Sequence, residues 1–433
     1  MAFRKMLSCL AAIGCLLWSA PGIGAAQGPR LIVLDAAALE NCRAQLRQGD
    51  HALYPAFAKL VRNCEEGMTL GPWSVTWKTE TSPNGDRHEY VSYGPYFWPN
   101  PATKDGLPYV IRDGEVNPKS KTSDSDALVA MSRTARILAL GWFYTGNPNY
   151  ASRAALILRT WFLDPATAMR PDMQYAQGAP GGWPGRAWGI VESRQLLQVV
   201  DAAALLEGSR AWSREDAAKL KRWFGQFVTW LETSEFGKAE ARAPNNHQSW
   251  YLAQVAGFAA YAGMEATARQ AVVTGRELLA SQIAPDGCQP EEVRRPTSLR
   301  YSLFNLEALY TVACIGENLG IDLWDVPSPG DARCKIALDY MLPALLGRGE
   351  WPHKNTRPLG GWEAVFVLRQ GCLHYHIQAY DEALRVQLGD AYDANRIFLE
   401  FPGEAPSGSR RQGRAHSGAA AASARPSCGV LEK

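Results

Sequence analysis

The sequence predicts an all-α protein built as a toroid of antiparallel helical hairpins. Apolar residues recur at helical spacing in one segment after another between residues 124 and 346. These segments run for roughly 13–20 residues and are separated by short joints marked by glycine or proline, as antiparallel helix pairs require. Nothing alternates like a sheet strand over more than a few residues. Consecutive hairpins of this kind predict a ring whose loops meet at one mouth.

Length and composition allow a large hydrophobic core. The chain has 433 residues, of which 46% are hydrophobic and 20% are charged. A formal net charge of +2 gives no overall attraction to nucleic acid, and the body of the chain has no basic block of the kind that binds it. Beyond residue 26, no stretch reaches the roughly 18–20 apolar residues of a membrane helix. We expect a monomer that binds neither nucleic acid nor membrane.

Residues 1–26 are interpreted as a signal peptide for export. Arg4 and Lys5 precede an apolar run at residues 6–20, and Gly24, Ala25 and Ala26 provide the small residues of a cleavage site. We therefore expect the mature protein to be periplasmic or secreted. Residues 27–403 form the predicted helical domain. The Ser/Ala/Gly/Arg-rich segment 404–433 is a predicted disordered tail, because it has too little apolar surface to bury.

The predicted export makes disulfide bonds possible, because disulfides persist outside the cytoplasm. The number of cysteines beyond the signal is odd, so at least one thiol has no partner within the chain. Cys42 and Cys64 lie in consecutive helical patterns and are one possible pair, and Cys314 and Cys334 are a second. No C-x-x-C motif occurs, and the histidines lack the partners of a zinc site. We expect neither a metal nor another cofactor.

Two long stretches interrupt the helical pattern. Residues 35–67 predict two helices, the first capped by Asp35. Residues 69–126 and 173–188 are instead rich in glycine, proline and aromatic residues. Ordered loops of such length within a domain are usually functional. The remaining helices are expected at residues 126–144, 150–163, 190–206, 214–233, 246–262, 264–283, 298–319, 334–346 and 376–389.

The first of these loops carries a cluster of aromatic side chains. Tyr93, Tyr96, Phe97 and Trp98 lie within the sequence S-Y-G-P-Y-F-W-P-N-P. Aromatic rings bind the apolar C–H faces of sugars and keep a polar group for hydrogen bonding. Tyr96 and Trp98 are the best candidates for such contacts. The alternative is that these rings fill the core beneath the loop.

The most informative stretch is P-N-N-H-Q-S-W-Y-L-A-Q, which begins at Pro244. Proline suits the first turn of a helix, where free N–H groups and the helix dipole favour a negative charge. Asn245, Asn246 and His247 at this position predict a carboxylate-binding site, and Trp250 shares their helical face. Alternatively, Asn245 only caps the helix and His247 is a core histidine whose hydrogen bonds are satisfied.

A second polar stretch, Q-P-E-E-V-R-R-P-T-S-L-R-Y, ends at Tyr301. In the helix that follows, Tyr301 lies on a different face from the apolar packing stripe. A tyrosine in that position, directly after an arginine cluster, indicates a catalytic residue. The plain alternative is that Arg294, Arg295 and Arg300 are solvated and pair with the two neighbouring glutamates.

Together these motifs resemble the alginate lyase family of polysaccharide lyases. The matching stretches are N-N-H-x-x-W-Y, Q-P-x-E-x-x-R with a downstream S-L-x-Y-S-L-F-N-L-E, S-x-x-P-Y-x-W-P-x-P, D-G-x-x-N-P, T-W-F-L-D-P, G-I-V-E-S-R and W-P. The resemblance spans residues 70–355. It departs from the family at Arg300, where histidine is frequent, and at Thr297, where arginine is frequent. We expect these departures to affect subsites and the choice of polymer.

The resemblance implies an incomplete toroid and β-elimination on a polyuronate, an anionic polysaccharide. A uronate C5–H is weakly acidic because its carboxylate is already negative, so that charge must be neutralised and the enolate-like dianion stabilised. Asn246, His247 and Arg295 are expected to do this. By resemblance, Tyr301 is the acid and, for syn elimination, also the base; His247 is the alternative base. Arg295 and Arg300 are expected to lower the pKa of Tyr301.

The predicted substrate-binding residues are Asn245, Trp250, Tyr96, Trp98, Arg194 and Arg300. Two other functions are considered. A glycoside hydrolase on a similar toroid would need a close pair of carboxylates, and a periplasmic polysaccharide-binding protein would tolerate loss of Tyr301. The polymer cleaved (mannuronate, guluronate, glucuronate or mixed) and the choice between endo and exo attack depend on how the two aromatic loops close the cleft.

Overall fold

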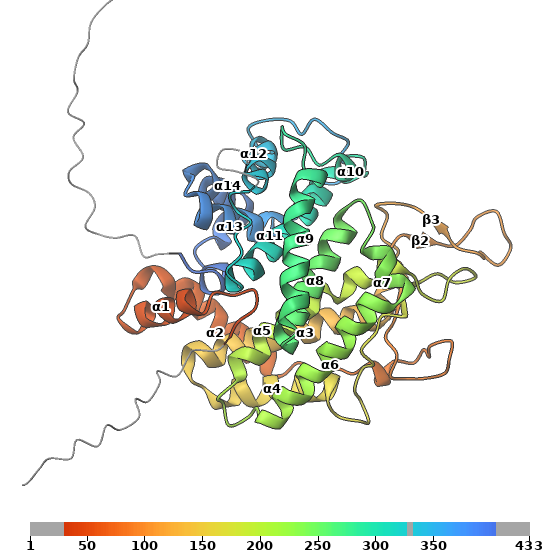
Figure 1. Cartoon of the computed structure of the whole chain (residues 1–433), viewed down its shortest axis with the longest axis horizontal. Coiled ribbons are helices and arrows are strands. Elements are labelled where there is room, and N and C mark those ends of the chain that lie inside the picture. Colours follow the sequence, from red (N-terminus) through yellow and green to blue (C-terminus); the bar gives the residue numbers. More distant parts are fainter. Residues whose placement is uncertain (1–29, 327–331, 404–433) are drawn as a thin grey trace, which may run out of the picture. The chain divides into compact units, whose positions relative to one another are not determined.

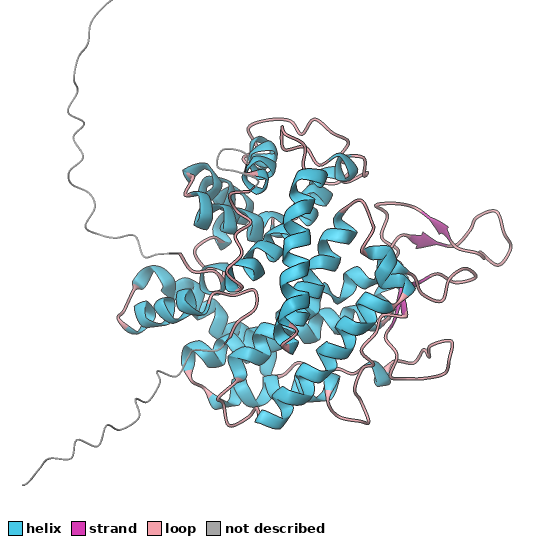
Figure 2. Ribbon diagram, viewed as in Figure 1, coloured by secondary structure: helices cyan, strands magenta, loops and turns pink. Residues whose placement is uncertain are grey.

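Residues 30–326 and 332–403 are described by a computed structural model of the protein. Within these ranges the chain is mostly helical, as predicted, and its strands are short (Figures 1 and 2). The predicted signal at 1–26 and the predicted tail at 404–433 lie outside the described residues. No helix within the described ranges is long and apolar enough to cross a membrane.

The elements follow one another in a simple order. The α-helices are α1 (Ala36–Arg47), α2 (Tyr54–Met68), α3 (Asp124–Thr145), α4 (Pro148–Phe162), α5 (Leu197–Leu206), α6 (Arg214–Thr233), α7 (Glu235–Glu240), α8 (Asn246–Ala262), α9 (Glu265–Gln282), α10 (Pro290–Val293), α11 (Ser298–Asn318), α12 (Arg333–Leu345), α13 (Val365–Tyr375), α14 (Gln378–Leu388) and α15 (Ile397–Glu400). The 3-10 helices are η1 (His51–Leu53), η2 (Val75–Trp77), η3 (Pro118–Thr122), η4 (Ala187–Leu196), η5 (Trp362–Ala364) and η6 (Gly389–Ala391).

Most helix boundaries agree with the sequence pattern. Asp35 caps α1 as predicted, because its carboxylate accepts hydrogen bonds from the N–H groups of Ala37 and Ala38 at 2.8 and 3.1 Å. The helix predicted at 190–206 divides into η4 and α5. Helix α13 was not predicted, because it has no polar stripe. Its Gly371 packs so closely that an added Cβ would lie 2.5 Å from Leu338 Cδ2 of α12.

The two aromatic-rich loops are joined by a short sheet. Strand β1 (Val91–Tyr93) from the first loop pairs in parallel with β4 (Tyr175–Gly178) from the second. Strand β2 (Phe97–Trp98) pairs antiparallel with β3 (Val110–Ile111) inside the first loop. None of these strands was predicted, since strands of this length are too short to show an alternating pattern. The pairing holds the two loops together near one end of the helices.

Helix α8 lies among other helices, in contact with α5, α6, α9 and α11 (Figure 1). Because neighbours surround it, apolar residues occur on every side, and the expectation that Trp250 shares a functional face with the first-turn residues is wrong. Trp250 is 3% exposed and Gln254 is fully buried, where it accepts a hydrogen bond from Ser193 Oγ. The first turn of α8 faces a cavity.

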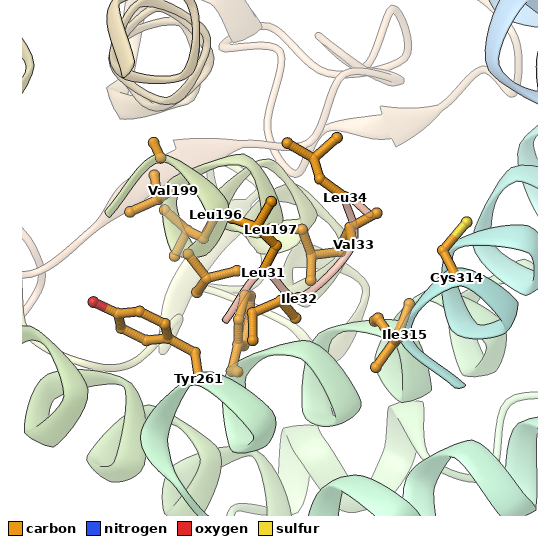
Figure 3. Packing of buried hydrophobic residues seen from close by; sticks show 14 of the residues in the cluster. Leu31, Ile32, Val33, Leu34, Leu196, Leu197, Val199, Tyr261, Cys314 and Ile315 are labelled. Atoms are coloured by element: carbon orange, nitrogen blue, oxygen red, sulfur yellow. The ribbon is translucent and has the colours of Figure 1, made fainter. Parts of the chain in front are cut away.

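A buried carboxylate ties the N-terminal segment to the core. Asp201 on α5 accepts backbone hydrogen bonds from Ile32 at 2.7 Å, Val33 at 3.2 Å and Leu34 at 3.1 Å. It also pairs with the buried Arg136 of α3 at 3.3 Å. The four apolar side chains at 31–34 pack beside Leu196, Leu197, Val199, Tyr261 and Ile315 (Figure 3). The carboxylate satisfies backbone donors that this buried, non-helical segment would otherwise leave unpaired.

The two proposed disulfides are not present. Cys42, Cys64, Cys314 and Cys334 are buried free thiols. Cys64 lies against α3, where its Sγ contacts the carbonyl oxygen of Ile137 at 3.4 Å. Helical spacing placed Cys42 and Cys64 on neighbouring helices, but it does not show that the Cys64 side chain faces a third helix. Burial raises the pKa of the Cys64 thiol to about 12, so it stays protonated and unreactive.

We predict that Asp201→Asn lowers the free energy of unfolding by about 3–5 kcal/mol, the range for breaking a buried charge pair by removing one partner. The substitution leaves Arg136 with less compensation and puts an amide N–H₂ where backbone donors need an acceptor. Urea unfolding followed by tryptophan fluorescence measures the change. Asp390→Asn, at an exposed position, is the control and should leave the midpoint unchanged. Equal midpoints for both variants would contradict the prediction.

Candidate active site

A cavity of about 910 Å³ opens where the aromatic loops meet the first turns of α8 and α11. Eight of the predicted site residues line it: Tyr96, Arg194, Asn245, Asn246, His247, Arg295, Arg300 and Tyr301. The two predicted tryptophans do not. Trp250 is buried and packs against Phe304, with ring centroids 5.1 Å apart and the ring planes tilted by 41°. Trp98 donates its Nε1–H to the carbonyl of Glu115 and packs against Arg112.

The hydroxyl of Tyr301 is held by two neighbours. Arg295 donates from Nη2 to the Tyr301 oxygen at 2.7 Å, and its guanidinium lies 3.8 Å from the centre of the Tyr301 ring. The hydroxyl of Tyr96 lies 2.9 Å from that of Tyr301. Tyr96 was predicted to contact sugar, but its polar end is directed at Tyr301. Both groups can donate to the Tyr301 oxygen when it is ionised, so they form a cradle for a phenolate.

Arg295 is not a free cation. Its Nε and Nη2 donate to the two carboxylate oxygens of Asp113 at 3.0 and 2.9 Å, the bidentate geometry typical of arginine and carboxylate. Asp113 belongs to the first aromatic loop. The expectation that Arg295 neutralises a substrate carboxylate is therefore revised, because Asp113 already balances its charge. In the structure Arg295 positions Tyr301.

The pKa of Tyr301 was expected to be lowered by Arg295 and Arg300. It is instead raised well above its usual range, first because the hydroxyl is buried and next because of the adjacent Tyr96. Arg295 acts in the expected direction but does not outweigh burial. Arg300 lies further along the cavity wall, where its nearest carboxylate is Glu363 at 3.8 Å. At neutral pH Tyr301 is thus a neutral phenol.

The first turn of α8 is held in place by a carboxylate. Glu292 of α10 is 1% exposed and accepts hydrogen bonds from the backbone N–H and the side-chain Nδ2 of Asn246, at 2.7 and 2.8 Å. Asn245 caps the helix by accepting the N–H of His247 at 3.1 Å. The two bonds to Glu292 fix the orientation of the Asn246 side chain. The second hydrogen of its Nδ2 amide is not used by Glu292.

His247 is oriented by a second buried carboxylate. Its Nδ1 lies 2.8 Å from Glu240 Oε2, and Glu240 is 2% exposed. A carboxylate can only accept, so Nδ1 carries the proton and Nε2 is the nitrogen left for a substrate. The ring also lies beside Trp188, with centroids 6.1 Å apart. Protonation of Nε2 as well would make that nitrogen a hydrogen-bond donor.

A model of the alginate lyase family matches residues 74–351, which include most of the described chain and every predicted site residue. The chain belongs to the alginate lyase family, and it is a polysaccharide lyase. The predicted family is thereby confirmed. No curated protein matches the sequence.

Solved structures of alginate lyases resemble the chain over nearly its whole described length. It is similar to an alginate lyase from Bacteroides ovatus, with 33% identity, a TM-score of 0.78, and coverage of 86% of this chain and 98% of that one. It shares the fold of alginate lyase A1-III complexed with a tetrasaccharide, at 16% identity and a TM-score of 0.54, with 88% and 98% of the two chains covered. A second A1-III complex with a tetrasaccharide has 15% identity and a TM-score of 0.52, with 81% of this chain and 90% of that one covered.

Sequence reasoning missed the residues that support the site. Asp113 and Glu240 escaped it because nothing in one chain shows which carboxylate reaches which cation. Glu292 was considered only as a partner for the arginines. The structure shows that Glu291 takes that role, pairing with Arg294 on the surface, while Glu292 turns inward to Asn246. The family motif D-G-x-x-N-P contains Asp113, so the sequence marked this residue, but no role was assigned to it.

We predict that Asp113→Asn lowers the lyase rate by about 10–100-fold, because loss of a charged hydrogen bond costs about 1.5–3 kcal/mol. Arg295 should then be free to move away from the Tyr301 hydroxyl. Initial rates on the polymer measure the loss. Glu115→Gln, at an exposed position on the same loop, should keep the wild-type rate. A wild-type rate for Asp113→Asn would show that Arg295 needs no partner.

Proposed function

We propose that this lyase cleaves a uronate-containing polymer, alginate or a related polyuronate, by β-elimination, and that its helical hairpins form an incomplete toroid around the cleft. The observation that supports the reaction most strongly is the Tyr301 hydroxyl, which lies in the cavity between two potential donors, Arg295 at 2.7 Å and Tyr96 at 2.9 Å. His247 and Asn246 line the same cavity. This set offers a proton-transfer group beside donors for a carboxylate.

The first chemical requirement is to stabilise negative charge on the substrate. Removing the C5 proton converts the uronate carboxylate into an enolate-like dianion, and fixed donors lower the energy of that charge. Nε2–H of His247 and the remaining amide hydrogen of Asn246 are suited to this, since Glu240 and Glu292 fix both side chains. Because those partners are in place before substrate arrives, no reorganisation is needed during the reaction.

The second requirement is a group that removes one proton and supplies another. Tyr301, as the phenolate, takes the C5 proton; the C5–H electrons form the C4=C5 double bond as the C4–O bond breaks. Tyr301 then returns the proton to the departing oxygen, so that one residue is base and acid on the same side of the sugar. Arg295 favours the phenolate, whose formation burial disfavours. The hydroxyl of Tyr96, 2.9 Å away, can donate a hydrogen bond to the ionised oxygen. His247 is the alternative base if elimination is anti.

The polymer is proposed from the relatives. Alginate lyase A1-III is described as complexed with a tetrasaccharide, and the Bacteroides ovatus protein is described as an alginate lyase. A cavity with Arg194 and Arg300 on its wall provides positive charge for such an acidic chain. Trp188 is 49% exposed at the cavity and offers a ring face to a sugar.

We predict that Tyr301→Phe abolishes elimination while leaving the fold intact. The variant keeps the ring that lies under Arg295 and loses only the oxygen. The rate should fall by at least the roughly 10²–10⁴-fold typical of a general acid–base group. The new double bond is conjugated with the carboxylate, so turnover appears as ultraviolet absorbance. Tyr54→Phe, on an exposed tyrosine, is the control. A variant with most of the wild-type rate would leave His247 as the base.

Neighbouring arginines provide a second test. Arg295→Lys keeps the charge but loses the fork that joins Asp113 to Tyr301, so we expect the rate to fall by about 10–100-fold, in line with the loss of charged hydrogen bonds. Arg294→Lys should stay near the wild-type rate, because Arg294 is exposed and pairs with Glu291 on the surface. Parallel rate measurements on one polyuronate compare them. The reverse order would mean that Arg294 supports the tyrosine.

A further inference from the structure

The first aromatic loop contains a buried charge that the proposed reaction does not use. Lys78 directly follows η2, and its side chain is 7% exposed. Its Nζ lies 3.1 Å from Oδ2 of Asp124, the first residue of α3, whose side chain is 4% exposed. Burial takes both charges out of water, so such a pair persists only where further hydrogen bonds satisfy it. Both residues lie outside the cavity lining.

Backbone carbonyl groups supply the further hydrogen bonds of Lys78. Its Nζ donates to the carbonyl oxygens of Val75 at 2.6 Å, Arg87 at 3.0 Å and Glu89 at 2.6 Å. An ammonium group has three hydrogens, so the three carbonyls engage all of them while Asp124 balances the charge. The four oxygens come from three separate stretches of the chain. Lys78 thus holds them around one point, as a bound cation would.

The same ion pair fixes the beginning of β1. Asp124 Oδ2 accepts the backbone N–H of Val91, the first residue of the strand, at 2.9 Å. The carbonyl of Glu89, to which Lys78 donates, lies two residues earlier. Both sides of the pair therefore bind the backbone where the chain enters β1, and together they determine the position of that strand.

Strand β1 leads directly to a residue that contacts Tyr301. The next residue, Gly94, donates its N–H to the last carbonyl of β4 at 3.0 Å. Its own carbonyl accepts the N–H of Phe97 at 3.2 Å, which closes a tight turn. Tyr96 lies inside this turn, and its hydroxyl meets that of Tyr301 at 2.9 Å. The position of the Tyr96 hydroxyl thus depends on where β1 is held.

We propose that Lys78 is a positioning residue for the elimination: its buried ammonium is an internal cation that holds the start of β1, and β1 in turn places the hydroxyl of Tyr96 against that of Tyr301. The inference rests on the proposed function, in which Tyr301 transfers the proton. It goes beyond that function by assigning a role to a residue outside the cavity. It also implies a site for a small organic cation where the lysine head group lies, because four oxygens surround that point at 2.6–3.1 Å.

A double-mutant cycle tests the positioning role. Lys78→Met keeps the length of the side chain and loses its charge, so kcat should fall by about 10–100-fold, the effect of charged hydrogen bonds, with KM within a few-fold. In the Tyr96→Phe background the same substitution should change kcat by less than about threefold, because the hydroxyl that Lys78 places is already absent. Lys104→Met, at an exposed position on the same loop, should keep the wild-type rate.

Chemical rescue separates positioning from stability. Lys78→Ala lacks three carbons and the ammonium group, which free propylammonium supplies. Saturating propylammonium should raise kcat of Lys78→Ala by at least about tenfold, the effect of a charged hydrogen bond, whereas propanol, which has no charge, should not. Urea midpoints of each variant show whether it is folded. Lys78→Arg keeps the buried charge but not the compact ammonium, so it takes the place of Lys78→Met in the cycle if that variant does not fold.

The cycle decides the inference. A loss of kcat that is equal with and without the Tyr96 hydroxyl, or a wild-type rate for the Lys78 variants, would overturn the positioning role. The absence of rescue in folded Lys78→Ala would also count against it. Failure of the proposed function looks different, because it is seen without any change at Lys78: no ultraviolet absorbance would develop on any polyuronate, or Tyr301→Phe would keep the wild-type rate.

Discussion

The active site depends on one buried contact, the carboxylate of Glu292 against the first turn of α8. It accepts both the backbone N–H and the side-chain amide of Asn246, and it lies on the short helix that leads directly to Arg295. A helix N-terminus favours a negative charge. Here Glu292 supplies that negative charge at the first turn of α8. The side chains of this turn that line the cavity remain available to the substrate. The same contact therefore fixes the two stretches of sequence that carry the chemistry.

The cavity shows how an enzyme for an anionic polymer can carry carboxylates of its own. Each of three acids is assigned to one functional side chain: Asp113 to Arg295, Glu240 to His247 and Glu292 to Asn246. They orient and polarise their partners without facing the substrate as free charges. These assignments also weigh against a glycoside hydrolase, since neighbouring Glu291 and Glu292 point to opposite environments and cannot act as a pair. Net attraction for the polymer then comes from arginines along the wall.

Much of this could be read from the sequence, and the remainder could not for physical reasons. Helical periodicity located most helices, and the local motifs at 245–247 and 295–301 located residues that line the cavity, because both signals are contained in short windows. The sequence did not reveal that Arg295 is paired or that Trp250 is buried. Both facts depend on partners far along the chain: Asp113 is separated from Arg295 by 182 positions. The possible pairing of Cys42 with Cys64 is absent, and the sequence could not show this because spacing does not reveal which helix a side chain faces.

The contact between Tyr96 and Tyr301 has a consequence for how the enzyme becomes active. The two hydroxyls belong to residues 205 positions apart, so neither the early nor the late part of the chain contains both of them. During folding, the entropy of closing so long a loop must be overcome before the two rings meet, and such non-local contacts form slowly. Recovery of catalysis after denaturation should therefore trail recovery of helical structure. Activity in this protein reports on completion of the tertiary fold.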